Sequence, residues 1–387
     1  MNPVFASLPV TVFTRMSALA QARGAINLGQ GFPDARGPED MLAAAAEALL
    51  TGDNQYPPTR GTEALRRAIA AHYAHHQGLE IDWPGETIVT SGATEALAAT
   101  ILGLVSPGDE VIVFQPAYDA YVPLIRQAGG APRFIGLAPP DWRITREALD
   151  AVASPRTRAI VLNSPLNPSA SMVSDEELAM LAEFCVARDL IAICDEVWEH
   201  VVFDGRVHRS LMTLPGMRER AVKIGSAGKI FSLTGWKVGW AIAAPRLADP
   251  IAKAHQFLTF TTAPNLQAAV AHGLAKDDGY FTDMRAGYER SRDRLASALT
   301  DAGYAVLPCA GTYFLLIDLP ASGIGLDDES FCQRIVAEFG VAAIPVSALY
   351  DERPVTSTVR LCFAKRDDTL DAAAERLGRA RAALVHR

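Results

Sequence analysis

The stretch Gly225-Ser-Ala-Gly-Lys-Ile-Phe-Ser-Leu-Thr-Gly-Trp-Lys-Val-Gly239 is the most informative part of the sequence. It continues an apolar run that begins at Ala221, and it holds Lys229 and Lys237, eight residues apart. Lysine is scarce, because only six of the 36 lysines and arginines are lysines and the first 222 residues have none. A lysine that occurs in such an arginine-rich chain can be one whose amine is needed for chemistry. The count alone is equally compatible with chance.

On the amino-terminal side of this stretch, short apolar runs alternate with helical patterns. The predicted strands are 87–90, 110–114, 158–163, 190–195 and 221–225. The predicted helices are 38–52, 62–77, 93–105 and 175–188. Runs that are apolar throughout are typical of strands covered on both faces. Helices that alternate with such strands predict an α/β fold with a mostly parallel sheet.

The pattern changes near residue 280. A long helix (283–302), a strand (313–319), a helix (327–339), a second strand (358–363) and a carboxyl-terminal helix are predicted there. This order indicates a smaller α+β domain. We therefore expect an N-terminal segment (1–38) that joins the small domain and the pocket, a large domain (39–282) and a small C-terminal domain (283–387).

Composition narrows the class of protein. The 387 residues are 49% hydrophobic and 21% charged, as in an ordinary globular protein. The net charge of -8 argues against nucleic acid as a partner, since nucleic-acid binding needs a basic face. No run is long and apolar enough to span a membrane, and no signal peptide is visible, so we expect a cytoplasmic protein without a membrane partner.

The cysteines and histidines suggest no metal site. The five cysteines lack paired zinc-like spacing and lie partly in apolar runs, so we expect buried thiols in a reducing compartment. His72, His75 and His76 fall on the predicted helix 62–77, and we interpret them as solvated, a metal site being the alternative. We expect no metal.

The central stretch, Ser-x-x-Lys followed by Thr-Gly-Trp-Lys-Val-Gly, resembles the lysine signature of fold-type I, class I/II aminotransferases, which depend on pyridoxal phosphate (PLP). Six further motifs match that family in order and spacing: Asn27-Leu-Gly-Gln-Gly-Phe-Pro-Asp34, Asn54-Gln-Tyr56, Ser91-Gly-Ala-Thr-Glu-Ala-Leu97, Asn163-Ser-Pro-Leu-Asn-Pro168, Cys194-Asp-Glu-Val197 and Arg360-Leu-Cys-Phe-Ala-Lys365. They resemble the branch of kynurenine, glutamine–phenylpyruvate and methionine aminotransferases. The resemblance implies a three-layer large PLP-binding domain and a homodimer with shared active sites.

The resemblance assigns the cofactor contacts. Lys229 would carry PLP as a Schiff base. Ala93 and Thr94, at a helix start where amides point at an anion, would hold the phosphate with Ser226, Lys237 and, from the neighbouring subunit, Tyr56. Asp195, at the end of an apolar strand, would pair with the protonated ring nitrogen. Asn167 would bond the phenolic oxygen, and Tyr118 would stack on the ring.

The same resemblance assigns the substrate contacts. Arg360 would bind the α-carboxylate as a planar bidentate donor, and Gly31 would let the chain approach it closely. Phe13 and, from the partner, Phe260 would line the side-chain pocket, with Asn167 beside the substrate. The resemblance also implies cis bonds at Gln115–Pro116 and Asn167–Pro168.

Two positions depart from the family pattern. Trp198 stands where a tyrosine usually donates to the phenolic oxygen, so that contact is open. The family's Asn-Pro-Thr-Gly is here Asn167-Pro-Ser-Ala170, which can reshape the loop and keep Asn167.

These residues indicate ping-pong transamination between an L-amino acid and a 2-oxo acid, with Lys229 moving the proton. Phe13, Phe260 and Thr261 offer no cation for a second carboxylate, so methionine, glutamine or aromatic donors are favoured over aspartate. A PLP-dependent C–S β-lyase acting on cystathionine or cysteine conjugates is the alternative. A PLP-sensing transcriptional regulator would need a DNA-binding domain, for which the pattern leaves no room.

Overall fold

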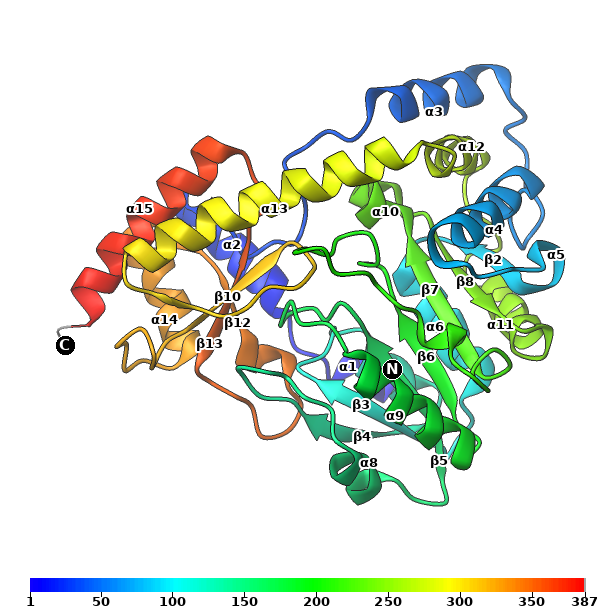
Figure 1. Cartoon of the computed structure of the whole chain (residues 1–387), viewed down its shortest axis with the longest axis horizontal. Helices are drawn as coiled ribbons and strands as arrows, with labels where there is room; N and C mark the ends of the chain where they lie inside the picture. Colours follow the sequence, from blue (N-terminus) through cyan, green and yellow to red (C-terminus); the bar gives the residue numbers. More distant parts are fainter. Residues whose placement is uncertain (386–387) are drawn as a thin grey trace.

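A seven-stranded sheet forms the centre of the protein in the computed structural model, which describes residues 1–385 (Figure 1). Its strand order is β2-β8-β7-β6-β5-β3-β4, and only β8 runs antiparallel to its neighbours. The strands are β2 (Thr87–Thr90), β3 (Glu110–Gln115), β4 (Ala131–Gly136), β5 (Thr157–Asn163), β6 (Ile191–Asp195), β7 (Ala221–Ser226) and β8 (Gly239–Ala243). All five predicted strands of this sheet are present, which confirms the α/β prediction.

Helices cover the sheet on both faces, and strand β6 shows why. Its residues alternate between two cores: Ile191 and Ile193 belong to one, Ala192 and Cys194 to the other. Because successive side chains of a strand point to opposite faces, an entirely apolar strand needs a layer of helices on each side. One layer contains α6 (Ala93–Leu104) and α11 (Pro245–Leu258), and the other contains α4 (Glu63–Gln77), α9 (Asp175–Ala187) and α12 (Pro264–Leu274). The large part is therefore three-layered, as predicted.

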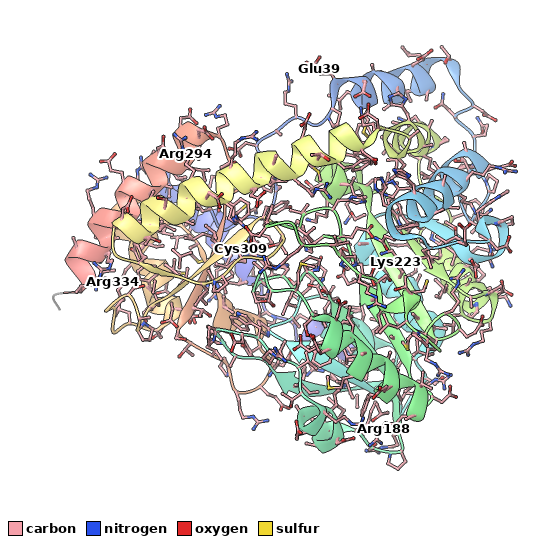
Figure 2. The ribbon with its side chains drawn as sticks, viewed as in Figure 1. Glu39, Arg188, Lys223, Arg294, Cys309 and Arg334 are labelled. Atoms are coloured by element: carbon pink, nitrogen blue, oxygen red, sulfur yellow. The ribbon has the colours of Figure 1, made fainter. Side chains whose placement is uncertain are left out.

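A second, antiparallel sheet forms the smaller α+β part. Its order is β12 (Ile344–Pro345), β13 (Thr358–Cys362), β10 (Phe314–Asp318) and β9 (Ala305–Val306). Helices α13 (Asp278–Asp301) and α15 (Asp367–Leu384) lie side by side against it, and Arg294 of α13 pairs with Asp371 of α15 at 2.6 Å (Figure 2). Near the start of the chain, β1 (Ile26–Asn27) pairs with β11 (Val341–Ala342), which ties the N-terminal segment to this part.

The remaining helices connect these layers. They are α1 (Pro3–Ala6), α2 (Val12–Arg23), α3 (Glu39–Thr51), α5 (Trp83–Glu86), α7 (Tyr121–Gln127), α8 (Arg146–Val152), α10 (Ala227–Ile230) and α14 (Asp328–Arg334). Among residues 1–385, no helix is long and apolar enough to cross a bilayer. All five cysteines are buried and free, as expected.

Two helices differ from their predicted bounds. Helix α13 begins at Asp278, five residues before the predicted start, because the Asp277 side chain accepts a hydrogen bond from the Tyr280 amide and caps it. The predicted domain boundary at 282/283 thus falls inside a continuous helix, and the division into domains stays a prediction. The predicted helix 327–339 is α-helical only to Arg334 and ends in a π-helical turn, Ile335–Phe339.

The interpretation of His72 as solvated is wrong. His72 is 3% exposed, and its Nε2 lies 2.7 Å from Nε2 of His200. It lies three residues after Ile69, so the helical repeat places it on the core face of α4. Burial lowers the pKa of His72 to about 4 and keeps it neutral. His75 is exposed and His76 is partly buried.

Candidate active site

The carboxyl ends of the parallel strands meet at one edge of the large sheet. Strands β5, β6 and β7 end there at Asn163, Asp195 and Ser226. A cavity of about 180 Å³ opens at this edge, as expected where α/β sheets bind ligands. Nine of the predicted cofactor residues line it: Ala93, Thr94, Tyr118, Asn167, Asp195, Trp198, Ser226, Lys229 and Lys237.

Lys229 lies in α10, a single helical turn directly after β7. Its Nζ donates a hydrogen bond to the Tyr313 hydroxyl at 3.1 Å and lies 4.7 Å from the centre of the Trp198 ring. Burial lowers the pKa of Lys229 to about 8. A far larger fraction of this amine is therefore unprotonated near neutral pH than for an ordinary lysine, so it is suited to attack a carbonyl and to move a proton.

Asp195 offers a buried carboxylate to the cavity. The Tyr121 hydroxyl donates to its Oδ2 at 2.6 Å, whereas its Oδ1 is buried and has no hydrogen-bond partner. Burial raises the pKa of Asp195. A buried acceptor without a partner costs free energy, and a charged N–H donor on a ligand would satisfy it. The protonated ring nitrogen of PLP fits this requirement.

The amino end of α6 forms the opposite wall. Its N-cap is Gly92, with φ of 81°, and the amides of Ala93 and Thr94 form its first turn. A Cβ placed on Gly92 would lie 3.3 Å from Lys237 Nζ, so the ammonium group packs beside the helix start. Free amides, a helix dipole and an ammonium group together suit a phosphate, and the Ser226 hydroxyl lies in the same cavity.

Arg360 reaches the site from β13 of the small sheet. Its Nη1 donates to Asn167 Oδ1 at 2.8 Å, its Nη2 donates to the Gly29 carbonyl at 2.7 Å, and its Nε has no partner. The guanidinium carbon lies 3.9 Å from the centre of the Phe314 ring and 5.1 Å from that of Phe13. Burial lowers the pKa of Arg360 to about 10, so it stays charged at neutral pH.

The other predicted residues divide into two groups. Gly31 is at the site, since its carbonyl accepts the Tyr313 hydroxyl at 2.6 Å and a Cβ on it would meet Phe314 at 2.8 Å. Tyr56 and Phe260 lie outside the cavity, 82% and 40% exposed, with their rings edge to face at 5.3 Å. Gln115–Pro116 and Asn167–Pro168 are both cis, as predicted.

Sequence reasoning missed three residues of the site. Tyr121 bonds Asp195, Tyr313 bonds Lys229, and the Asn163 amide group both donates to the Asp195 carbonyl at 2.8 Å and accepts the Asn167 amide at 2.9 Å. Tyr121 lies only three residues after Tyr118, and this closeness in sequence is the one signal that points to it. Tyr313 precedes β10 without any local motif.

A buried amine, a carboxylate with an unpaired oxygen and an anion cradle in one cavity of an α/β fold define a PLP-dependent enzyme. The family model described as Aminotransferase class I and II matches residues 23–377, and the chain belongs to this family. It is therefore a PLP-dependent aminotransferase, and such enzymes act on amino acids and 2-oxo acids.

Similar proteins agree with this assignment. The chain is 44% identical to methionine aminotransferase of Escherichia coli, over 96% of each chain, and 45% identical to a probable N-succinyldiaminopimelate aminotransferase, DapC, of Mycobacterium tuberculosis, over 95% of each. The crystal structure of YbdL from Escherichia coli, identified with a methionine aminotransferase function, superimposes with a TM-score of 0.95 at 42% identity, covering 98% of this chain and 99% of that one.

Proposed function

We propose that this enzyme moves the amino group of an L-amino acid to a 2-oxo acid by a ping-pong mechanism, with methionine, glutamine or aromatic amino acids as preferred donors. The observation that carries the proposal is the convergence of Lys229, Asp195 and Asn167 on one cavity, with Arg360 bonded to Asn167. Lys229, Asp195 and Asn167 belong to the large part of the fold, and Arg360 belongs to the small sheet. A substrate whose carboxylate is bound by Arg360 would therefore lie close to the Lys229 amine.

Each of these residues has a distinct task in the proposal. Arg360 binds the α-carboxylate through its planar fork, which Asn167 and Gly29 hold in place. Lys229 Nζ removes the proton from the Cα of the amino donor in the first half-reaction. In the second half-reaction it delivers a proton to the Cα of the new amino acid. The Tyr313 hydroxyl, bonded to that Nζ, keeps the amine beside Trp198. Bound PLP withdraws electrons from the substrate and stores the amino group between the half-reactions.

The remaining polar groups would hold the cofactor in place. Asp195, oriented by Tyr121, keeps the ring nitrogen protonated. The start of α6, with Ser226 and Lys237, holds the phosphate. Tyr118 is fixed by a hydrogen bond of 3.2 Å between its hydroxyl and that of Thr94, which suits a ring that stacks on the cofactor.

The preference for uncharged donors is supported by the residues around Arg360. Phe13 packs near its guanidinium, and the residues that line the cavity within 1–385 include no cation besides Lys229 and Lys237, which are engaged with the reaction and the phosphate in this proposal. A second carboxylate buried there would lack a cationic partner, which is costly. Similarity to methionine aminotransferase of Escherichia coli supports the same preference.

A homodimer with shared sites is part of the proposal. The rings of Tyr56 and Phe260 pack edge to face at the surface, away from the cavity of their own chain. Phe257, three residues before Phe260, is 86% exposed, and an apolar side chain this exposed is a candidate for burial by a second copy. In such a dimer, Tyr56 would reach the phosphate and Phe260 the substrate side chain of the partner.

The test is a matrix of amino donors and 2-oxo acceptors assayed with purified holoenzyme. We expect parallel lines in double-reciprocal plots and a higher kcat/KM for methionine, glutamine or an aromatic donor than for aspartate. Aspartate outranking all of them would overturn the proposed preference. Formation of pyruvate and ammonia from cystathionine without any acceptor would instead indicate a C–S β-lyase.

A further inference from the structure

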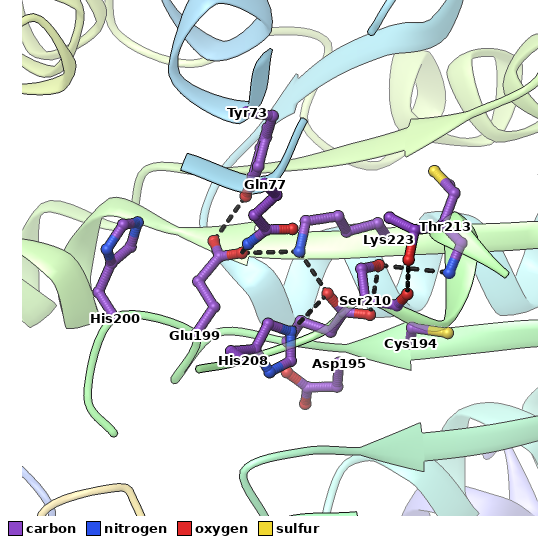
Figure 3. A network of polar contacts seen from close by, with 12 residues as sticks. Tyr73, Gln77, Cys194, Asp195, Glu199, His200, His208, Ser210, Thr213 and Lys223 are labelled. Carbon is purple, nitrogen blue, oxygen red and sulfur yellow. Dashed lines mark hydrogen bonds and ion pairs between the residues drawn. The ribbon is translucent and has the colours of Figure 1, made fainter. Parts of the chain in front are cut away.

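A lysine lies inside the large sheet, immediately behind the proposed active site. Lys223 occupies the middle of β7, between Val222 and Ile224, and its side chain is 0% exposed. Its Nζ donates to Glu199 Oε2 at 2.6 Å and also to Glu196 Oε2 (Figure 3). A buried ammonium group needs such partners, because an unpaired charge in a protein interior is strongly destabilising.

Four further side chains complete the bonding of the two carboxylates. Glu196 lies 2.9 Å from His208 Nε2 and accepts the Ser210 hydroxyl at 2.8 Å. Glu199 accepts the Tyr73 hydroxyl and the Gln77 side-chain amide, each at 2.6 Å. The other titratable groups facing the cluster are His72 of α4, Cys194 of β6 and His200 of the following loop.

The charge of this cluster depends on Lys223. Burial is the largest influence on Glu199 and opposes its ionisation, but Lys223, His200 and His208 together overcome it, and the pKa of Glu199 is lowered to about 2. Glu196 follows the same pattern, and its pKa is also lowered. With Lys223, two buried carboxylates share one ammonium group. Without it, both would lose that charged partner.

The cluster is joined to the active site through the backbone. Glu196 follows Asp195, Glu199 follows Trp198, and the Glu199 amide donates to the Glu196 carbonyl at 3.1 Å to form a turn. The two glutamates thus anchor this turn on the side away from the cavity, while Asp195 and Trp198 line the cavity. Tyr118, Tyr121 and Lys229 also face Asp195, whose pKa is raised mainly by burial and further by the charge of Glu196.

We propose that Lys223 is a positioning residue for transamination: its pairing with Glu196 and Glu199 keeps the turn 195–199 in place and leaves Asp195 ionised toward the cofactor. This inference rests on the proposed role of Asp195. Lys223 touches neither substrate nor cofactor, so its effect must pass through the two glutamates.

Lys223→Met tests the inference, because it keeps a long apolar side chain and removes the charge. A buried carboxylate that loses its charged partner has a raised pKa, and its ionised form is the costly one. We expect the Kd for PLP to rise about tenfold or more at pH 9, the equivalent of one pKa unit or more, and clearly less at pH 6. The absorbance of bound cofactor should shift, and kcat should fall with an unchanged KM for the donor, since Arg360 is untouched.

Two further variants separate charge from packing. Lys223→Met/Glu199→Gln removes one charge of each sign and should restore PLP affinity to within about threefold of wild type, without the pH trend. Lys253→Met removes an exposed lysine on α11 and should change nothing. If Lys223→Met does not fold, Lys223→Gln replaces it, because its amide can still donate to one glutamate.

The outcomes distinguish this inference from the proposed function. Reduced thermal stability with unchanged PLP affinity and absorbance would overturn the positioning role and leave only a structural one. Asp195→Asn serves as the reference. If it leaves the cofactor absorbance and affinity unchanged, the proposed role of Asp195 is wrong. If it alters them and Lys223→Met does not, only the role of Lys223 is wrong.

Discussion

Replacing Arg360 with alanine should selectively weaken amino acid binding. The guanidinium is 1% exposed and already held by Asn167 and Gly29, so it is pre-organised to meet a carboxylate. Truncating one partner of a buried, hydrogen-bonded charge pair costs about 2–5 kcal/mol. At about 1.4 kcal/mol per tenfold, kcat/KM for the donor should fall by roughly 30-fold to several thousandfold.

Steady-state kinetics with a saturating 2-oxo acid measure this loss, and the affinity for PLP should stay near the wild-type value. Arg366→Ala is the matched control, because the Arg366 side chain is 73% exposed and pairs with the neighbouring Asp368 at the surface. Arg360→Lys keeps the positive charge but loses the planar guanidinium donor group. Its kcat/KM should therefore lie between those of Arg360→Ala and Arg366→Ala. A KM within threefold of wild type in Arg360→Ala would show that another residue binds the carboxylate.

Three further predictions concern the cofactor side of the site. Lys229→Ala should retain PLP without covalent attachment and lower kcat by at least about a hundredfold; near-normal turnover would refute its role. Tyr121→Phe removes the donor to Asp195 Oδ2, so kcat/KM should fall about tenfold, and an unchanged value would mean that Asp195 needs no such support. Because burial lowers the pKa of Lys229 to about 8, covalent uptake of PLP by the apoprotein, followed by absorbance, should accelerate as pH rises through 8. A midpoint near 10 would contradict this.

Local patterns were sufficient to predict the frame of the protein. The apolar run before Asp195 predicted a buried strand, and its end predicted a ligand site, because strand burial and chain direction are properties of short segments. Strand β4 was missed, since its residues are mostly exposed or partly exposed at the edge of the sheet and leave no apolar run. Strand β8 was missed because it follows the lysine motif without a turn signal of its own.

Contacts between distant segments were beyond sequence reasoning. Tyr313 is 84 residues from Lys229, and Glu199 is 126 residues from Tyr73, so only the folded sheets bring these pairs together. The interpretation of His72 as solvated is wrong for a related reason. Its helix was predicted correctly, but an imidazole side chain can pack in a core when a second histidine shares a hydrogen bond with it, and His200 lies on another segment.

Helix α13 has a mechanical role that follows from its length. Its 24 residues span about 36 Å, with Phe281 packed in the core of the large sheet and Leu295 and Leu299 in that of the small sheet. An unbroken helix acts as a stiff lever, and tilting it by one degree at Phe281 displaces its far end by about 0.5 Å. The small sheet carries Arg360. A change in packing around Phe281 would therefore move Arg360 relative to the cavity and alter its distance from the substrate carboxylate.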